Sequence, residues 1–154
     1  TTNTINGNTL TITPNTLLAA NTQYTITLQA GSITDLAGNP IALYTRPFTT
    51  DNTAPTPTAG NPARNAINIP IDTTITTTFN EPIKEGNMNI QLQSSTGTII
   101  PTTNTINGNT LTITPNTLLE KATTYTIILQ AGSVTDLGGN PIALYTRPFT
   151  TESV

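Results

Sequence analysis

The feature that most constrains the fold of this chain is an internal repeat. Residues 1–50 and residues 102–151 align without gaps and are identical at 43 of 50 positions, with an offset of 101 residues. Near-identity at this offset indicates a duplicated structural unit about as long as the offset, and favours a tandem array. An enzyme rarely needs tandem copies this alike, whereas a spacer or a fibre does.

The hydrophobic pattern within the repeat is that of β-strands. Apolar and polar residues alternate throughout, and helical periodicity is absent. Pro101 interrupts one expected strand, which predicts an edge or a bulge there, and Asn107-Gly108 predicts a type I′ hairpin turn. The expected strands are 59–69, 73–79, 88–93, 98–106, 109–114, 125–130 and 143–150. About seven short strands in such a length are typical of an all-β, immunoglobulin-like (Ig-like) antiparallel sandwich.

Two tyrosines are placed to support this fold. Residues 118–125 are expected to cross between the sheets and to enter a strand at Tyr125, and Tyr24 has the same place in the first copy. This is the setting of a tyrosine corner, in which the phenol bonds to the upstream backbone. The alternative for Tyr24 and Tyr125 is an ordinary core position.

The repeat also predicts the domain organisation. Residues 1–50 are the C-terminal half of one Ig-like module, called here a back half, and residues 58–151 are a complete module. In that module residues 58–101 are the front half and residues 102–151 are the second back half. The linker is expected at residues 51–57, where prolines favour an extended joint, and residues 152–154 begin the next linker or a tail.

Several phrases carry a family resemblance. They are NPARNAINIPIDTTITTTFNEPI, NTLTITPNTLLEKATTYTIILQAGSVTDLGGNPI and the closing FTT. With them, the chain resembles the bacterial Ig-like domain that is repeated in S-layer and adhesin proteins, with a complete domain over residues 54–151 and a half over residues 1–50. The resemblance implies a cell-surface or extracellular location, whereas the function of such modules varies with their context.

Composition excludes several kinds of chemistry. The chain has no cysteine or histidine, which removes the usual zinc ligands and the base of a Ser-His-Asp triad. Five basic residues are spread along the sequence, so a nucleic-acid partner is not expected. The apolar runs are too short to insert into a bilayer. We expect no enzymatic activity and no cofactor, with calcium as the open alternative.

That calcium site would use four residues. Glu81 is expected to follow one strand, and Asp136 and Asn140 lie in a loop at the same end of the sandwich, which Asp51 in the linker could also reach. Calcium takes oxygen ligands from flexible loops. The alternative is that Asp136 and Asn140 cap their own loop through side-chain to backbone hydrogen bonds.

The half module raises the question of function. Its apolar residues require a front half to bury against, and exposed edges and core faces invite partners. Either residues 1–50 are a fragment of a longer array or they pair with another chain. The leading prediction is a structural repeat of an extracellular fibre (filament), stalk or surface layer that self-associates by half-domain or strand complementation. The alternative is an adhesin domain that binds a ligand through the loops around Glu81 and Asp136, and surface glycans are further candidate partners.

Overall fold

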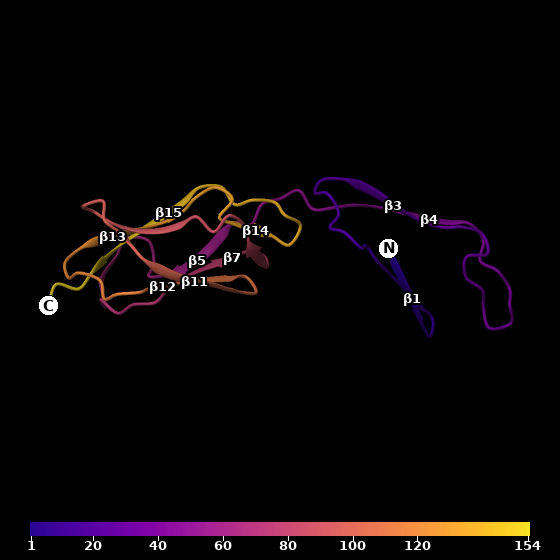
Figure 1. The fold of residues 1–154 in the computed structure, drawn as a ribbon, viewed down its shortest axis with the longest axis horizontal. Helices are drawn as coiled ribbons and strands as arrows, with labels where there is room; N and C mark the ends of the chain where they lie inside the picture. Colours follow the sequence, from indigo (N-terminus) through magenta and orange to yellow (C-terminus); the bar gives the residue numbers. More distant parts are fainter. The chain divides into compact units, whose positions relative to one another are not determined.

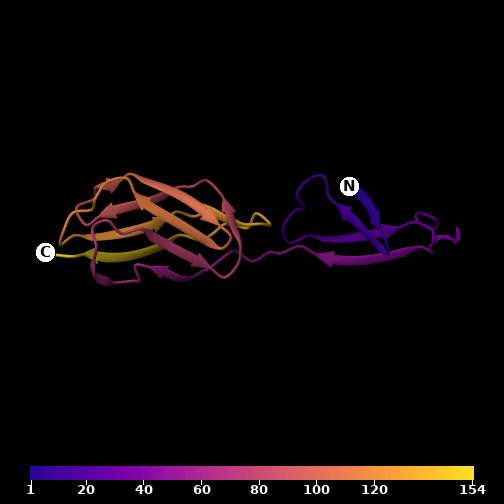
Figure 2. The same ribbon diagram turned by 90° about the horizontal axis from the view of Figure 1, so that it is seen from below.

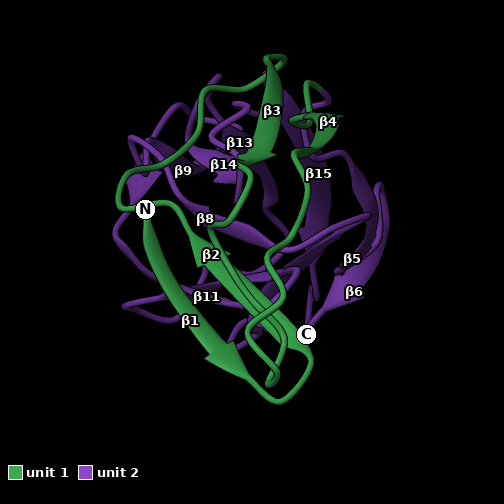
Figure 3. Cartoon of the chain, turned by 90° about the vertical axis from the view of Figure 1, so that its right-hand side faces the viewer, with its two compact units in different colours: residues 1–52 green, residues 53–154 purple.

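The computed structural model describes residues 1–154, which divide into two units, Thr1–Asn52 and Thr53–Val154. Figure 1 shows the strands coloured along the sequence, and Figure 3 shows residues 1–52 as unit 1 and residues 53–154 as unit 2. Both units consist of β-strands, turns and loops, which confirms the all-β prediction. No helix could span a membrane.

Unit 2 is the complete sandwich. Its larger sheet has the order β10-β9-β13-β15-β6, and its smaller sheet the order β11-β12-β7-β5. All neighbours pair antiparallel except β15 and β6, which are parallel. The larger sheet consists of β10 (Ile99–Ile100), β9 (Ile90–Ser94), β13 (Thr124–Leu129), β15 (Tyr145–Thr151) and β6 (Ala66–Ile69). The smaller sheet consists of β11 (Thr102–Asn107), β12 (Thr110–Pro115), β7 (Ile75–Phe79) and β5 (Pro57–Asn61).

Unit 2 also contains a short two-stranded sheet that is separate from the two larger sheets. Strand β8 (Ile83–Glu85) pairs antiparallel with β14 (Val134–Asp136). The pair joins the segment after β7 to the segment after β13, and it places the loops that carry Glu81 and Asp136 next to each other.

The core of unit 2 follows from strand alternation. Every second residue of β7 and β13 is buried while its neighbours are partly exposed, because successive side chains of a strand point to opposite faces. In the predicted strand 73–79, the alternate residues Ile75, Thr77 and Phe79 are all buried. The full apolar core contains Ile75, Phe79, Ile83, Leu92, Leu111, Ile113, Leu119, Tyr125, Ile127, Leu129, Val134, Ile142 and Phe149.

Unit 1 contains only four strands, arranged as two separate pairs. Strand β1 (Thr2–Asn6) pairs with β2 (Thr9–Thr13), and β3 (Gln23–Leu28) pairs with β4 (Tyr44–Thr49), both antiparallel. These strands match β11, β12, β13 and β15 of unit 2 in sequence, so unit 1 is the back half of a sandwich.

The structure corrects some predicted strands. The stretch 59–69 is two strands in opposite sheets, β5 and β6, and the stretch 98–106 is likewise β10 and β11. Pro62 and Pro101 stand at the two crossings, where a residue without an N–H group costs no ladder hydrogen bond. Strand β5 already begins at Pro57, within the predicted linker. Met88 precedes β9 with a positive φ of 53° instead of starting the strand.

The hairpin turn is also one residue later than predicted. Asn107 pairs with Thr110, so the two loop residues are Gly108 and Asn109. Gly108 has a φ of 60°, and Asn109 is not among the residues of positive φ. A type I′ turn requires positive φ at both positions, whereas a type II′ turn requires it only at the first, where glycine is favoured. The type I′ prediction was therefore wrong, and Gly7 repeats the same geometry in unit 1 with a φ of 59°.

Candidate functional site

Three of the four predicted calcium ligands, Glu81, Asp136 and Asn140, lie together in unit 2. The β8–β14 pair sets Asp136 opposite Ile83, two residues after Glu81, and carboxylate oxygens of Glu81 and Asp136 lie within 4.8 Å of each other. Asp136 is buried and Glu81 is half-buried. Two carboxylates this close are a common part of calcium sites, but such a pair is also found without a metal.

Asp136 also accepts hydrogen bonds within its own loop. Its Oδ1 accepts a hydrogen bond of 2.8 Å from the backbone N–H of Asn140, and its Oδ2 accepts one of 2.6 Å from the Asn140 side-chain amide. The backbone N–H of Asp136 donates to the Asn140 carbonyl at 3.1 Å. The alternative prediction of a capped loop is therefore confirmed for Asp136, whose carboxylate bonds to the loop backbone, whereas the side chain of Asn140 bonds to the Asp136 carboxylate. Asp51 lies at the end of unit 1, and its part in a calcium site stays a prediction.

Unit 1 contains the same loop. Asp35 Oδ1 accepts hydrogen bonds of 2.9 Å from the backbone N–H groups of Ala37 and Asn39, and Oδ2 accepts one of 2.8 Å from the Asn39 side chain. The bond from the Asn39 side chain is the main cause that lowers the pKa of Asp35 below its ordinary value, followed by the backbone bonds. The loop forms without a counterpart of Glu81, so its conformation is determined within residues 35–39.

Both predicted tyrosine corners are present. The backbone N–H of Glu120 donates to the Tyr125 hydroxyl at 2.9 Å, and that of Ala19 donates to the Tyr24 hydroxyl at 3.0 Å. Each ring stacks on a phenylalanine of the neighbouring strand, with centroid separations of 6.0 Å for Tyr125 and 5.9 Å for Tyr24. The corner is thus a local feature of the back half that does not depend on the front half.

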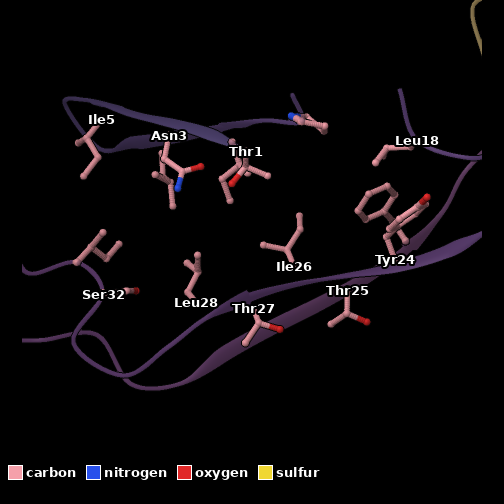
Figure 4. A pocket seen from close by; sticks show the side chains of 15 residues that line it. Thr1, Asn3, Ile5, Leu18, Tyr24, Thr25, Ile26, Thr27, Leu28 and Ser32 are labelled. Atoms are coloured by element: carbon pink, nitrogen blue, oxygen red, sulfur yellow. The ribbon is translucent and has the colours of Figure 1, made fainter. Parts of the chain in front are cut away.

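The most prominent candidate binding site is an open apolar groove in unit 1. A cavity of about 680 Å³ lies between the pairs β1–β2 and β3–β4. Figure 4 shows Ile26 and Leu28 pointing into the space between the two layers, while Thr25 and Thr27 point away. The apolar lining consists of Ile5, Leu10, Ile12, Pro14, Leu18, Tyr24, Ile26, Leu28, Ile33 and Phe48.

The same side chains are the core of unit 2. Phe149 is 1 % exposed, but its counterpart Phe48 is 40 % exposed. Leu111, Ile113, Ile127 and Leu129 are fully buried in unit 2, whereas Leu10, Ile12, Ile26 and Leu28 are only partly buried in unit 1. The groove is therefore the face of unit 1 that corresponds to the buried inner face of the sandwich in unit 2.

Three strand edges of unit 1 are open as well. In unit 2, β12 pairs with β7, β13 with β9, and β15 with β6. In unit 1 the equivalent strands β2, β3 and β4 each have one strand partner only. An open edge presents a row of backbone N–H and C=O groups that can take a further strand.

An arginine that sequence reasoning did not single out joins the two halves of unit 2. Arg147 of β15 is 2 % exposed and donates a hydrogen bond of 2.6 Å from Nη2 to the Thr76 carbonyl oxygen. A Cβ atom on Gly60 of β5 would lie 1.7 Å from Arg147 Nη1, so glycine provides the space for the guanidinium. The counterpart Arg46 is exposed. The signal that could have identified Arg147 as inward is its alternation with Phe149 and Thr151 along β15.

Comparison with known proteins agrees with this architecture. A family model described as "Bacterial Ig-like domain" matches residues 1–50 and again residues 51–151. Among solved structures, the fold is similar to that in "The crystal structure of CopC from Methylosinus trichosporium OB3b". The TM-score is 0.53 and the identity 12 %, over 64 % of this chain and 94 % of that one. At this identity the likeness shows the fold alone. No curated protein sequence matches the chain.

Proposed function

The chain belongs to the bacterial Ig-like domain family, and on that premise we propose that it is a structural, non-catalytic repeat that bears load in an extracellular fibre, stalk or surface layer. The observation that carries this proposal is the parallel pairing of β15 with β6 in unit 2. Near-identical copies in tandem also favour a spacing role over a catalytic one.

The parallel pair lies where tension would pass through unit 2. The unit begins with β5 and β6 and ends with β15, and Figure 2 shows Val154 at the end of the sandwich away from the point where the chain enters it. A pull on both ends therefore runs along β6 and β15 in opposite senses. The hydrogen bonds of the pair are then loaded together instead of one after another.

Backbone and side-chain bonds reinforce this connection. The Asn65 N–H donates to the Pro148 carbonyl at 2.7 Å, and the Glu152 N–H donates to the Ile69 carbonyl at 2.9 Å. The Arg64 guanidinium donates to the Thr146 carbonyl, and its Cζ lies 5.7 Å from the centre of the Tyr145 ring. Strand β15 is thus hydrogen-bonded to the first segment of unit 2 along much of its length.

Single-molecule pulling of the full chain tests the proposal. The chain has no cysteine, so pairs of engineered cysteines give unique attachment points. Cysteines at Thr53 and Val154 load the β6–β15 pair in shear, whereas cysteines at Thr123 and Val154 unzip the antiparallel β13–β15 pair from one end. We expect a several-fold higher unfolding force in the first geometry, because forced unfolding reports the barrier along the pulled direction. Equal forces in both geometries would contradict the load-bearing role.

Assembly of the array is the second part of the proposal. Open apolar faces and strand edges are sites of self-association, and unit 1 has both. We therefore propose that unit 1 joins a neighbouring repeat or chain by half-domain complementation, which would give the extracellular assembly its continuity.

A further inference from the structure

We propose that the free edge of strand β11 binds the same edge of a second copy of this chain, in antiparallel pairing about a two-fold axis at Asn104. The contact is lateral, between chains that lie side by side. It goes beyond the half-domain complementation proposed above, because it uses a different strand, lies in unit 2 and needs no open core.

The two larger sheets of unit 2 have four edge strands, and three of them carry features that hinder pairing with another strand. Strand β10 has only two residues. Strand β5 begins at Pro57, and its register with β7 shifts between Pro57 and Ala59. Strand β6 contains Asn68 with a φ of 57°, and its register with β15 also shifts. Short edges, prolines and bulges are the usual protection of a sheet edge.

Strand β11 has none of these features. It is six residues long, its sequence TTNTIN contains neither proline nor a charged residue, and its register with β12 is regular. Its one strand partner is β12. Strand β11 is therefore the edge of the sandwich that is built to accept a further strand.

The register of β11 determines which backbone groups face the free edge. Asn107 and Thr110 flank the two-residue hairpin loop and form a hydrogen-bonded pair, and bonded and non-bonded pairs alternate from there. Pro115, which has no N–H group, accordingly lies at a non-bonded position opposite Thr102. The residues whose N–H and C=O groups point away from β12 are Thr102, Asn104 and Ile106.

The free part of this edge is centred on Asn104. At the hairpin end the Ile83 N–H of β8 donates to the Gly108 carbonyl at 3.0 Å, so β8 occupies the space beside the end of the strand. The stretch Thr102–Ile106 remains. Two antiparallel copies of it match when Asn104 lies opposite Asn104 and the first residue of each stretch lies opposite the last residue of the other. Such an interface is isologous and closes as a dimer.

The side chains of the stretch are suited to this pairing. Thr103 and Thr105 are exposed and lie opposite each other across the axis, where threonine pairs stabilise a sheet and no like charges meet. Asn104 Oδ1 already accepts a hydrogen bond of 3.0 Å from Thr102 Oγ1. The side-chain amide N–H groups of Asn104 are thus directed to the second copy.

The same edge sequence stands in unit 1. Residues 1–6 are identical to residues 102–107, and β1 likewise pairs only with β2. A single short edge pair is weak in water, but contacts that repeat along two parallel arrays add through their effective concentration. We therefore expect a weak dimer of this chain and a stronger association of longer arrays.

Disulfide cross-linking of the full chain tests the register. The chain has no cysteine. In the proposed pair Thr103 lies opposite Thr105 of the second copy at a non-hydrogen-bonded position, with Cα atoms about 4.5 Å apart, which a disulfide spans. Identical positions lie about 7–8 Å apart. A mixture of Thr103→Cys and Thr105→Cys chains should therefore give several-fold more dimer under mild oxidation than either variant alone.

Two outcomes of this experiment overturn the proposal. The first is the absence of an excess of the mixed dimer. The second is that Thr103→Cys cross-links better to Thr4→Cys, at the equivalent position of β1, than to Thr105→Cys. That result would show that β11 pairs with unit 1 of another chain.

Sedimentation equilibrium of the unmodified chain and of edge variants measures the affinity. Asn104→Pro removes an N–H group that points to the second copy and leaves the bonds to β12 in place, so it should raise the dimer Kd roughly tenfold. Asn104→Asp sets two carboxylates opposite each other and should weaken the dimer most at low salt. Asn107→Asp, outside the paired stretch, is the matched control and should have little effect.

Thermal unfolding of each variant shows that the sandwich is intact. A native chain that stays monomeric at its highest soluble concentration overturns the proposal, as does an Asn104→Asp chain that dimerises like the Asn107→Asp control. Load bearing is measured on single molecules, and edge pairing is measured between molecules, so either idea can fail while the other stands.

Discussion

Units 1 and 2 place nearly the same 50 residues in two different environments. In unit 2 the back half covers a front half and forms a core, and Phe149 is 1 % exposed. In unit 1 the same strands form, the same tyrosine corner closes and the same aspartate loop folds, yet Phe48 is 40 % exposed. The difference shows that strands, corner and loop are local properties of the back half, whereas burial depends on the front half.

The strongest test of this comparison removes one aromatic ring from each unit. Phe149→Ala is expected to lower the free energy of unfolding of unit 2 by about 3–5 kcal/mol, because a core ring is replaced by a cavity. Phe48→Ala is its matched control and should change the stability of unit 2 by well under 1 kcal/mol. Urea unfolding followed by amide exchange in Thr124–Leu129 measures both. Similar losses from the two variants would mean that the units share one core.

Substitution of the buried Arg147 and of its exposed counterpart Arg46 should give the next largest difference in stability loss. Arg147→Ala leaves the Thr76 carbonyl without its charged donor and opens space beside Gly60. We expect a loss of about 1.5–3 kcal/mol, the range for hydrogen bonds to charged groups. Arg46→Ala, at an exposed position, should have almost no effect on thermal unfolding of the free chain. A neutral Arg147→Ala would show that the guanidinium is not needed for the contact between the sheets.

Removal of the tyrosine hydroxyl should give a smaller difference in stability loss between the two units. Tyr125→Phe removes the acceptor of the Glu120 N–H group in a part-buried site, which is expected to cost about 1 kcal/mol. The equivalent bond in unit 1 is exposed, so Tyr24→Phe should cost less, because water can replace the hydroxyl. Chemical denaturation of both variants, with amide exchange to assign the loss to a unit, measures the difference. An equal cost in the two units would contradict the local comparison.

Calcium binding is expected to distinguish the aspartate loop of unit 2 from that of unit 1. Glu81 and Asp136 approach each other in unit 2, whereas residues 1–52 contain no counterpart of Glu81 for the loop at Asp35. If the predicted site binds calcium with the millimolar affinity of some extracellular modules, several millimolar calcium should stabilise unit 2 by about 1 kcal/mol. Thermal unfolding in calcium and in chelator measures this, with Glu81→Gln as the control. A melting temperature that chelator leaves unchanged would contradict the calcium prediction.

The smallest expected effect is the pH dependence of the unit 1 loop. The hydrogen bonds from Asn39 and from the loop backbone lower the pKa of Asp35 in the folded state. The stabilisation from the charged carboxylate is therefore complete above the unfolded pKa of about 3.9, and it is lost as the pH falls through the lower, folded value. Exchange of the Asn39 amide should quicken in that window relative to its intrinsic rate. Asp35→Asn should abolish the transition, and a transition above pH 4 would contradict the sign.

Turn and crossing positions show where sequence reasoning was insufficient. Asn107-Gly108 indicated a hairpin, but the cross-strand pairing of Asn107 with Thr110 shifted the loop to Gly108-Asn109. The stretches 59–69 and 98–106 each looked like one strand, because alternation continues on both sides of a crossing between sheets. Neither pattern reveals which sheet a strand joins, since that choice depends on partners distant in the sequence.

The repeat, the alternation and the family phrases by themselves indicated the Ig-like sandwich and both tyrosine corners, and they offered the capped loop at Asp136 as one of two alternatives. These features depend on neighbours in sequence and on the two-residue period of a strand. Only the tertiary structure decided that β6 and β15 run parallel, that Arg147 fits over Gly60, and that the inner face of unit 1 is open. The two back halves are nearly identical in sequence, so propensity does not make one inner face a core and the other a groove; the front half that packs on the back half in unit 2 is the physical reason.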